Sequence, residues 1–155
     1  MERIPFTRKG YEALKREMDL LKTIERPKNI LAIEEARAHG DLSENAEYHA
    51  AKERQGFIQG RLASLSYKIS AADIIDPDDL PQDRVVFASR VLLENVDTEE
   101  TVKYQLVGPE ESDIGNGRIS VSSPLGKAIL GKQPGDEVTI TAPGGKRIYE
   151  LVEIL

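Results

Sequence analysis

The sequence predicts an α+β protein in which a long helical hairpin precedes a small antiparallel β-sheet domain with one short helix. Three observations lead to this prediction. Apolar residues recur every three or four positions before residue 76, which is the period of an amphipathic helix. A polar, glycine-containing turn near residue 40 divides this stretch into two arms. After residue 81 the pattern changes to alternation of apolar and polar residues, as in strands with one buried face.

In the first arm, Thr7 is a candidate N-cap, because its hydroxyl can accept a hydrogen bond from a first-turn amide. Pro27 lacks an N–H and its ring clashes with the preceding turn, so we expect a kink or a local break there. Gly40 suits the end of the arm. The apolar face consists of Tyr11, Leu14, Met18 and Leu21 before the proline, and of Ile30, Leu31, Ile33 and Ala36 after it.

The second arm has a more regular apolar seam. Its alternating steps of three and four residues are typical of a coiled coil, and the short turn makes the two arms antiparallel neighbours. At 1.5 Å per residue, an arm of about 30 residues would be about 45 Å long. Gly56 and Gly60 each cost about 1 kcal/mol relative to alanine within a helix, so we expect close packing or a bend there. The seam consists of Tyr48, Ala51, Gln55, Ile58, Leu62, Leu65, Ile69 and Ala72.

Composition changes at a proline- and aspartate-rich stretch, residues 77–81, which we interpret as a linker. It separates a hairpin domain, residues 1–76, from a β domain, residues 82–155. The expected strands are residues 84–93, 101–107, 137–141 and 147–155.

Two local signals organise the β domain. Ser123 is a candidate N-cap with Pro124 at the first helical position, and Gly131 ends the short helix that follows. The loop Ala142-Pro143-Gly144-Gly145 is expected to join the last two strands as a hairpin.

Composition excludes several classes of protein. The 155 residues contain no cysteine, which rules out a disulfide framework and a thiolate metal site. No apolar run approaches the roughly 20 residues of a membrane span, and the N-terminus lacks the apolar core of a signal peptide. The net charge of -6 argues against nonspecific binding of duplex DNA. We therefore expect a cytoplasmic protein whose nucleic-acid contacts are local or arranged by a partner protein.

The turn between the arms holds the candidate chemistry. Asp41 and Glu44 lie three residues apart, with Arg37, His39, His49 and Lys52 nearby. One interpretation is a capping box, in which Asp41 caps the second arm and Glu44 reaches back to it. The other is a pair of oxygen ligands delivered at the end of a long arm. The two can coexist, because a capped carboxylate can still offer an oxygen to a metal.

Several motifs in this chain resemble the Gre family of bacterial transcript cleavage factors. The tip signature is Gly40-Asp41-Leu42-Ser43-Glu44-Asn45-Ala46-Glu47-Tyr48-His49, and the likeness continues through Ala50, Ala51 and Gln55-Gly56-Phe57. A second signature runs through residues 119–132, and Thr141-Ala142-Pro143-Gly144-Gly145 is also similar. The resemblance covers nearly the whole chain in one register.

The resemblance implies a coiled coil followed by a domain similar to the FK506-binding-protein fold. In this family the coiled coil enters the secondary channel of RNA polymerase and stimulates the polymerase's own cleavage of backtracked RNA at its 3′ end. The factor is then an activator and not itself an enzyme, and we expect it to act as a monomer without a membrane. Asp41 and Glu44 would share a Mg²⁺ ion with the polymerase, and the isolated protein should hold that ion weakly.

The resemblance also suggests roles for other residues, each with a structural alternative. Arg37 and Lys52 could hold RNA phosphates or could be ordinary solvated helix charges. Asn45 could orient the RNA or simply start a helix, and Tyr48 is expected to pack in the seam. Both histidines are expected to face solvent. The polymerase-facing loop would consist of Ser122, Ser123, Pro124, Leu125 and Gly126, which could equally be a plain strand-to-helix junction.

Three other functions compete with cleavage stimulation. A Gre-like regulator could block the channel without activating cleavage, although such proteins usually alter the acidic tip. A prolyl isomerase or chaperone would match the fold of the second domain alone, but fold does not determine function and aromatic residues are sparse after residue 80. A structural coiled-coil adaptor would leave the acidic pair unexplained beyond capping.

Overall fold

The computed structural model describes residues 2–41 and 44–155, so Leu42 and Ser43 of the tip signature lie outside the described residues. The chain forms two compact units, Met1–Ile4 with Tyr11–Ala72 and Pro5–Gly10 with Asp73–Leu155. The predicted α+β class is confirmed. The short segment Pro5–Gly10, which the sequence division places in the hairpin domain, groups with the C-terminal unit.

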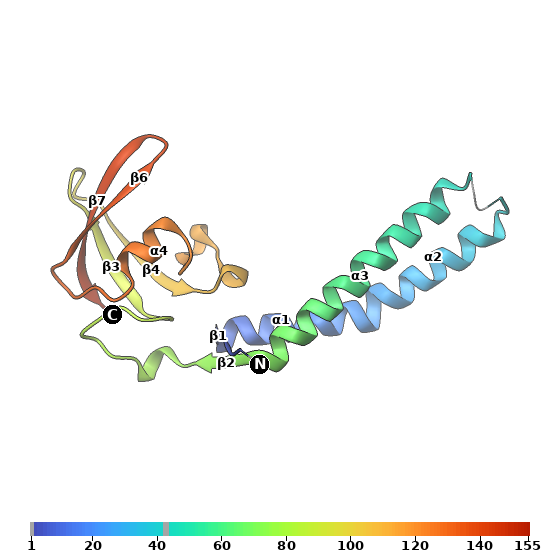
Figure 1. Ribbon diagram of the computed structural model, residues 1–155, viewed down its shortest axis with the longest axis horizontal. Coiled ribbons are helices and arrows are strands. Elements are labelled where there is room, and N and C mark those ends of the chain that lie inside the picture. Colours follow the sequence, from blue (N-terminus) through green and yellow to red (C-terminus); the bar gives the residue numbers. More distant parts are fainter. Residues whose placement is uncertain (1, 42–43) are drawn as a thin grey trace. The chain divides into compact units, whose positions relative to one another are not determined.

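The hairpin is built from α1 (Arg8–Leu20), a π-helical segment (Leu21–Glu25), α2 (Arg26–Ala38) and α3 (Ala46–Ala71). Figure 1 shows α2 running beside α3 up to the tip. The predicted N-cap is confirmed, because the Gly10 amide donates to the Thr7 hydroxyl over 3.1 Å. None of the helices in residues 2–41 and 44–155 is both long and apolar enough to cross a bilayer.

The π-helical segment compensates for one extra residue in the first arm. Buried residues of α3 keep a seven-residue spacing at Ala51, Ile58 and Leu65. On the facing arm, the buried Leu21 is followed after eight residues by the buried Asn29. A π turn closes hydrogen bonds from residue i to i−5, as the Arg26 amide does to the Leu21 carbonyl. The π turn accommodates the extra residue, so the buried seam keeps its register before and after the π segment.

The break predicted at Pro27 is therefore a π segment directly before the proline, which occupies the first turn of α2. The π segment also explains why the predicted apolar face of the first arm is wrong at two positions. Ile30 and Leu31 are 46% and 59% exposed, whereas Asn29 takes the seam position and donates its amide to the Ala51 carbonyl over 2.9 Å.

The expected close packing at the two glycines of α3 is wrong. A Cβ atom added at Gly56 or Gly60 would meet nothing within 4 Å, so both positions face open space. No close approach of another element offsets the unfavourable helix propensity of these two glycines.

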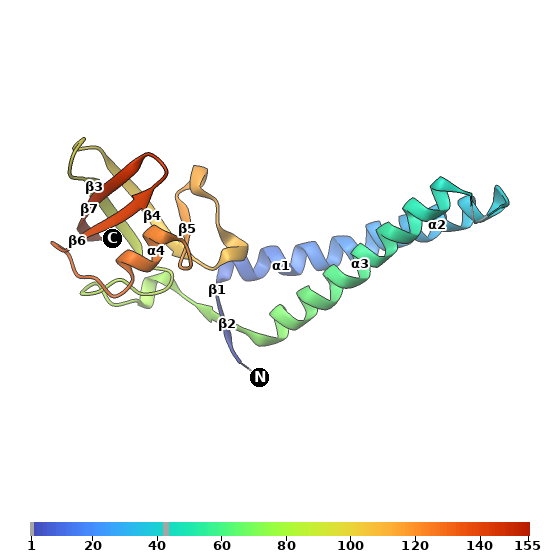
Figure 2. The ribbon, with the colours of Figure 1, turned by 45° about the horizontal axis from the view of Figure 1, so that its top comes forward.

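The C-terminal unit contains a five-stranded sheet with the order β5-β4-β3-β7-β6 (Figure 2). Three of its four pairings are antiparallel as predicted, but β5 runs parallel to β4 and was not anticipated. A further two-stranded sheet joins β1 (Ile4–Thr7) to β2 (Ala72–Ile75). The large sheet consists of β3 (Arg90–Asn95), β4 (Thr101–Val107), β5 (Arg118–Ser120), β6 (Glu137–Ala142) and β7 (Gly145–Ile154).

The first predicted strand begins six residues too early. Residues 84–89 are not a strand, because Ala88 has a positive φ of 72° and its amide bonds the Leu106 carbonyl outside a regular ladder. The short helix α4 (Pro124–Ile129) is capped as predicted, with Ser123 accepting from the Gly126 amide.

Candidate functional site at the tip of the helical hairpin

The chain reverses at the tip through His39 and Gly40. The His39 amide donates to the Ala36 carbonyl and the Gly40 amide to the Arg37 carbonyl, both over 3.2 Å. Gly40 then adopts a φ of +89°, which a residue without a Cβ atom tolerates best. The end of α2 is thus closed by backbone bonds before the acidic residues begin.

Asn45, and not Asp41, caps the second arm. Its side-chain oxygen accepts from the Tyr48 amide over 3.1 Å, and its amide nitrogen donates to the Ala36 carbonyl over 2.7 Å. The capping-box interpretation of Asp41 and Glu44 is therefore wrong, because α3 begins only at residue 46. Asn45 joins the start of one arm to the end of the other, and the cap needs neither carboxylate.

Asp41 and Glu44 share one short turn. The Glu44 amide lies 3.4 Å from the Asp41 carbonyl oxygen, and both residues are exposed. Carboxylate oxygens are hard donors that suit Mg²⁺, an octahedral ion that keeps several waters among its ligands. Over residues 2–41 and 44–155, no group of three or more acidic or histidine side chains is arranged to hold a metal. Two carboxylates would fill only part of such a coordination shell.

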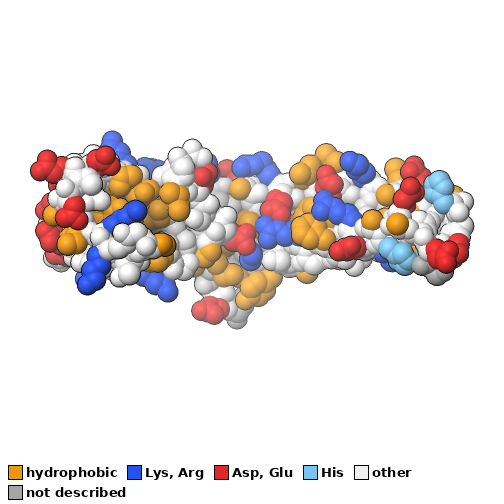
Figure 3. Space-filling view, turned by 90° about the horizontal axis from the view of Figure 1, so that it is seen from above, with side chains coloured by type: hydrophobic (Ala, Val, Ile, Leu, Met, Phe, Trp, Pro, Cys, Tyr) orange, Lys and Arg blue, Asp and Glu red, His pale blue; other side chains and the backbone are white. Residues whose placement is uncertain are grey.

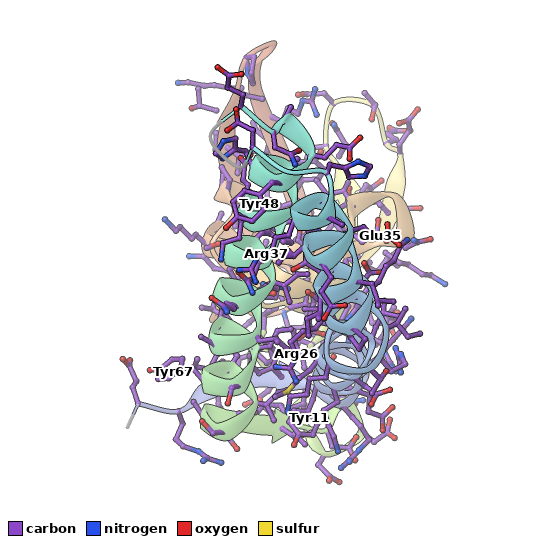
Figure 4. The ribbon with its side chains drawn as sticks, turned by 90° about the vertical axis from the view of Figure 1, so that its right-hand side faces the viewer. Tyr11, Arg26, Glu35, Arg37, Tyr48 and Tyr67 are labelled. Atoms are coloured by element: carbon purple, nitrogen blue, oxygen red, sulfur yellow. The ribbon has the colours of Figure 1, made fainter. Side chains whose placement is uncertain are left out.

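Arg37 and Tyr48 form a pair across the two arms just behind the tip. The guanidinium carbon of Arg37 lies 6.0 Å from the centre of the Tyr48 ring, at the outer limit of a cation–π contact, and Figure 4 shows the two labelled side chains together. His49 meets the same ring edge-on at 5.8 Å. Tyr48 was expected only to pack in the seam. Its pairing with Arg37 depends on how the arms face each other and has no local signal in the sequence.

The remaining tip residues are engaged locally. Lys52 donates to the Gln55 side chain over 2.9 Å on its own helix. The Nε2 atom of His39 lies 3.7 Å from a Glu47 oxygen, although both side chains are mostly exposed. Figure 3 shows histidine and carboxylate side chains together on the surface at this end of the hairpin. Both histidines face solvent, as expected.

The C-terminal unit contains a second candidate site. Ser123, Pro124 and Leu125 of the predicted polymerase-facing loop line a largely apolar groove of about 360 Å³. Ser122 is exposed beside it. A Cβ atom on Gly126 would lie 2.1 Å from the Ser120 carbonyl oxygen, so only glycine lets the helix sit this close to β5. The sequence did not predict the other groove residues, which include Tyr104, Ile114, Ile140, Arg147 and Tyr149.

Comparison with known proteins decides the family. Residues 4–74 match the model described as "Transcription elongation factor, N-terminal", and residues 80–155 match "Transcription elongation factor, GreA/GreB, C-term". The chain belongs to the GreA/GreB family of transcription elongation factors. The resemblance predicted from the tip and loop signatures is thereby confirmed.

Individual family members agree over the full length. The chain is 54% identical over 153 residues to the transcription elongation factor GreA of Thermodesulfovibrio yellowstonii, covering 99% of this chain and 97% of that one. GreA of Neisseria meningitidis serogroup A is 52% identical over 155 residues, with 99% and 98% covered. Among solved structures, GreA factor homolog 1 of Thermus thermophilus is 29% identical, with 99% of each chain covered and a TM-score of 0.44. The family assignment rests on the sequence matches.

Proposed function

We propose that this GreA/GreB family member inserts its helical hairpin into the secondary channel of bacterial RNA polymerase. There it stimulates the polymerase's own cleavage of backtracked nascent RNA, which frees the displaced 3′ fragment and lets arrested complexes resume elongation. The chain acts as a cytoplasmic monomer and is an activator, while the polymerase remains the nuclease. Full-length identity of about half to GreA proteins supports the transcriptional role.

The observation that carries the proposal is the position of Asp41 and Glu44. Both are exposed in one turn, and the cap of α3 is made by Asn45 without their help. Neither carboxylate is the N-cap of α3, so capping of that helix does not explain why acids occupy these two positions. Their placement suits delivery of oxygen ligands to a site that another protein completes.

Hydrolysis of a phosphodiester needs a deprotonated water and stabilisation of charge on the leaving oxygen, and paired Mg²⁺ ions supply both when bound. Asp41 and Glu44 offer two oxygen donors of the type that suits Mg²⁺. Carboxylates of the polymerase and an RNA phosphate would provide the remaining donors. Glu44 would also accept a hydrogen bond from the attacking water and hold it toward the phosphorus. Two acids alone do not make a nuclease, so the purified chain should leave free RNA intact.

Basic residues behind the tip would hold the displaced RNA. Arg37 and Lys52 lie one helical turn or more from the acidic pair, where their charges can meet phosphates. The Arg37 guanidinium lies over the Tyr48 ring, with 6.0 Å between its carbon and the ring centre. The contacts of Asn45 support the helix-start role, and any influence on the RNA would follow from the shape of the turn.

The apolar groove of the C-terminal unit would dock on the polymerase. Its wall of Ser123, Pro124 and Leu125 contains three of the five residues of the predicted polymerase-facing loop, and Ser122 and Gly126 flank them. The glycine holds this wall against β5 and so fixes its shape.

The test is cleavage in stalled, backtracked elongation complexes with 3′-labelled RNA. The wild-type chain should release the labelled fragment rapidly, and Asp41→Asn and Glu44→Gln should each slow release by a factor of about 100 or more while still binding polymerase. Glu47→Gln is the matched control, because Glu47 is an exposed acid of the same tip that we assign no ligand role. Equal activity of all four proteins would refute the assignment of the acidic pair.

A channel-blocking regulator is the second candidate, and the same assay separates it from the first. Such a protein would bind polymerase and inhibit elongation without cleavage, and its acid variants would behave like wild type. A prolyl isomerase is not favoured, because both halves of the chain match elongation-factor models.

A further inference from the structure

A hollow lies on the first arm where α1 meets the π-helical segment, and the cleavage chemistry does not use it. The hollow has a volume of about 420 Å³ and lies within the hairpin unit. It is lined by Lys15, Arg16, Asp19, Leu20, Thr23 and Ile24. The Thr23 hydroxyl donates to the Asp19 carbonyl over 2.8 Å and so occupies a backbone oxygen at its edge. A π turn is rare and often marks a functional position, so the hollow is a candidate binding surface.

The hollow exposes aliphatic side chains. Leu20 is 46% exposed and Ile24 is 54% exposed, although the same arm buries Leu14 and Leu21 in the seam. Hydrophobic side chains reach the surface of the hairpin between charged ones (Figure 3). A partner side chain that filled the hollow would remove this aliphatic surface from water, which is the main source of affinity at protein interfaces.

Basic residues outnumber acidic ones around the hollow, and two nearby acids of the first arm, Glu17 and Glu25, face arginines of α3 instead. Arg61 donates to Glu17 over 2.8 Å, and Arg54 lies 3.5 Å from Glu25. Of the charged residues that line the hollow, Lys15 and Arg16 are basic and only Asp19 is acidic. The chain as a whole has a net charge of -6, so a basic rim here is a local exception.

We propose that this hollow is a docking site for an apolar side chain flanked by carboxylates on the surface of RNA polymerase. The inference rests on the proposed function, which brings the hairpin into contact with that protein. The basic residues Lys15 and Arg16 favour an acidic partner surface. The aliphatic residues Leu20 and Ile24 favour an apolar side chain of a protein. RNA is a poorer fit, because the lining contains no aromatic ring on which a base could stack.

The test measures affinity for polymerase core by displacement of labelled wild-type protein. Ile24→Asp places a negative charge on the floor and should weaken binding by a factor of about 10 or more. Ile24→Lys should weaken it several-fold less, because the flanking carboxylates of the partner accept a cation. Leu31→Asp is the matched control: Leu31 is 59% exposed on the same arm but does not line the hollow, and its variant should bind like wild type.

Both positions are exposed, and thermal unfolding followed by circular dichroism would verify that each of the three variants keeps the hairpin. Equal affinity of Ile24→Asp and wild type would overturn the docking site. Equal losses for Ile24→Asp and Ile24→Lys would overturn the acidic partner surface, and an equal loss for Leu31→Asp would overturn the position of the site. If wild type itself failed to bind polymerase, the proposed function would fail together with this inference; binding by wild type and all variants alike would refute the inference alone.

Discussion

The two units of this chain are stabilised in different ways, and the difference bears on where the proposed ligand residues lie. The C-terminal unit packs a closed core around β3, where Val91 and Leu93 are fully buried, with further core residues from the other strands and α4. The hairpin has only a narrow seam between helices, and that seam includes the polar Asn29. Exposed carboxylates at the tip lower the stability of the hairpin little, because few buried contacts depend on the turn. Under the proposed function, the closely packed C-terminal unit would dock on the polymerase and the lightly packed arm would enter its channel.

The largest expected effect is in the C-terminal core. Leu93→Ala should lower the free energy of unfolding of that unit by about 2–5 kcal/mol, because it removes a fully buried side chain and leaves a cavity. Native-state hydrogen exchange would show faster exchange in β3, β4 and β7. Leu31→Ala, at an exposed position, is the control. A uniform loss of protection in both units would show that they unfold as one and would break the comparison.

The second effect concerns the buried carboxylate of Glu111, which attaches the N-terminal segment to the C-terminal unit. It accepts from the Thr7 amide over 3.1 Å, from the Thr7 hydroxyl and from Arg118 over 2.6 Å. Glu111→Gln removes the charge that compensates Arg118, whose side chain is only 17% exposed, and should cost about 2–3 kcal/mol.

Chemical denaturation would measure that loss, and Glu100→Gln, at an exposed position of the same unit, is the control. Faster exchange of the Gly10 amide is also expected, because Thr7 caps it and is itself held by Glu111. Unchanged stability together with unchanged Gly10 exchange would show that Glu111 does not hold this segment.

Features set by local chemistry could be predicted from the sequence, and those set by distant partners could not. Thr101–Val107 and the Ser123 cap were predicted correctly because alternation and capping are short-range signals. Asp41 and Asn45 are equally good caps by residue type. The bond from Asn45 to the Ala36 carbonyl, nine residues back, favours Asn45, and no short-range pattern predicts that bond.

The π segment and the strand β5 were missed for the same reason. The extra residue in the first arm becomes visible only when the arm is aligned with α3. The parallel pairing of Arg118–Ser120 with β4 depends on a crossover that no short motif encodes. For the site, residue types identified the acidic pair, whereas the assignment of the helix cap to Asn45 and the groove beside Ser123 required the folded chain.

A smaller and local effect is expected at the tip. Asn45→Ala should cost about 1 kcal/mol, because it removes the cap of α3 and the bond between the arms. Hydrogen exchange of the Tyr48 amide should rise while exchange in the C-terminal unit stays the same. Asn45→Asp keeps the accepting oxygen but loses the donor to Ala36, so its loss should be intermediate. Slower cleavage by Asn45→Ala at unchanged affinity for polymerase would show that tip order matters for chemistry.

The smallest effect should be a gain of stability in the C-terminal sheet. Glu150 on β7 lies directly opposite Glu94 on β3 and Glu137 on β6, so three carboxylates form a row across adjacent strands. Like charges in facing positions repel, and Glu150→Gln should therefore stabilise the unit by about 0.2–1 kcal/mol. Glu153→Gln is the control, because Glu153 on the same strand faces Leu92. The gain from Glu150→Gln should shrink as salt is added, since screening already weakens the repulsion in wild type. If salt left the gain unchanged, the gain would not come from repulsion within the carboxylate row. The C-terminal unit would then tolerate these three charges without loss of stability.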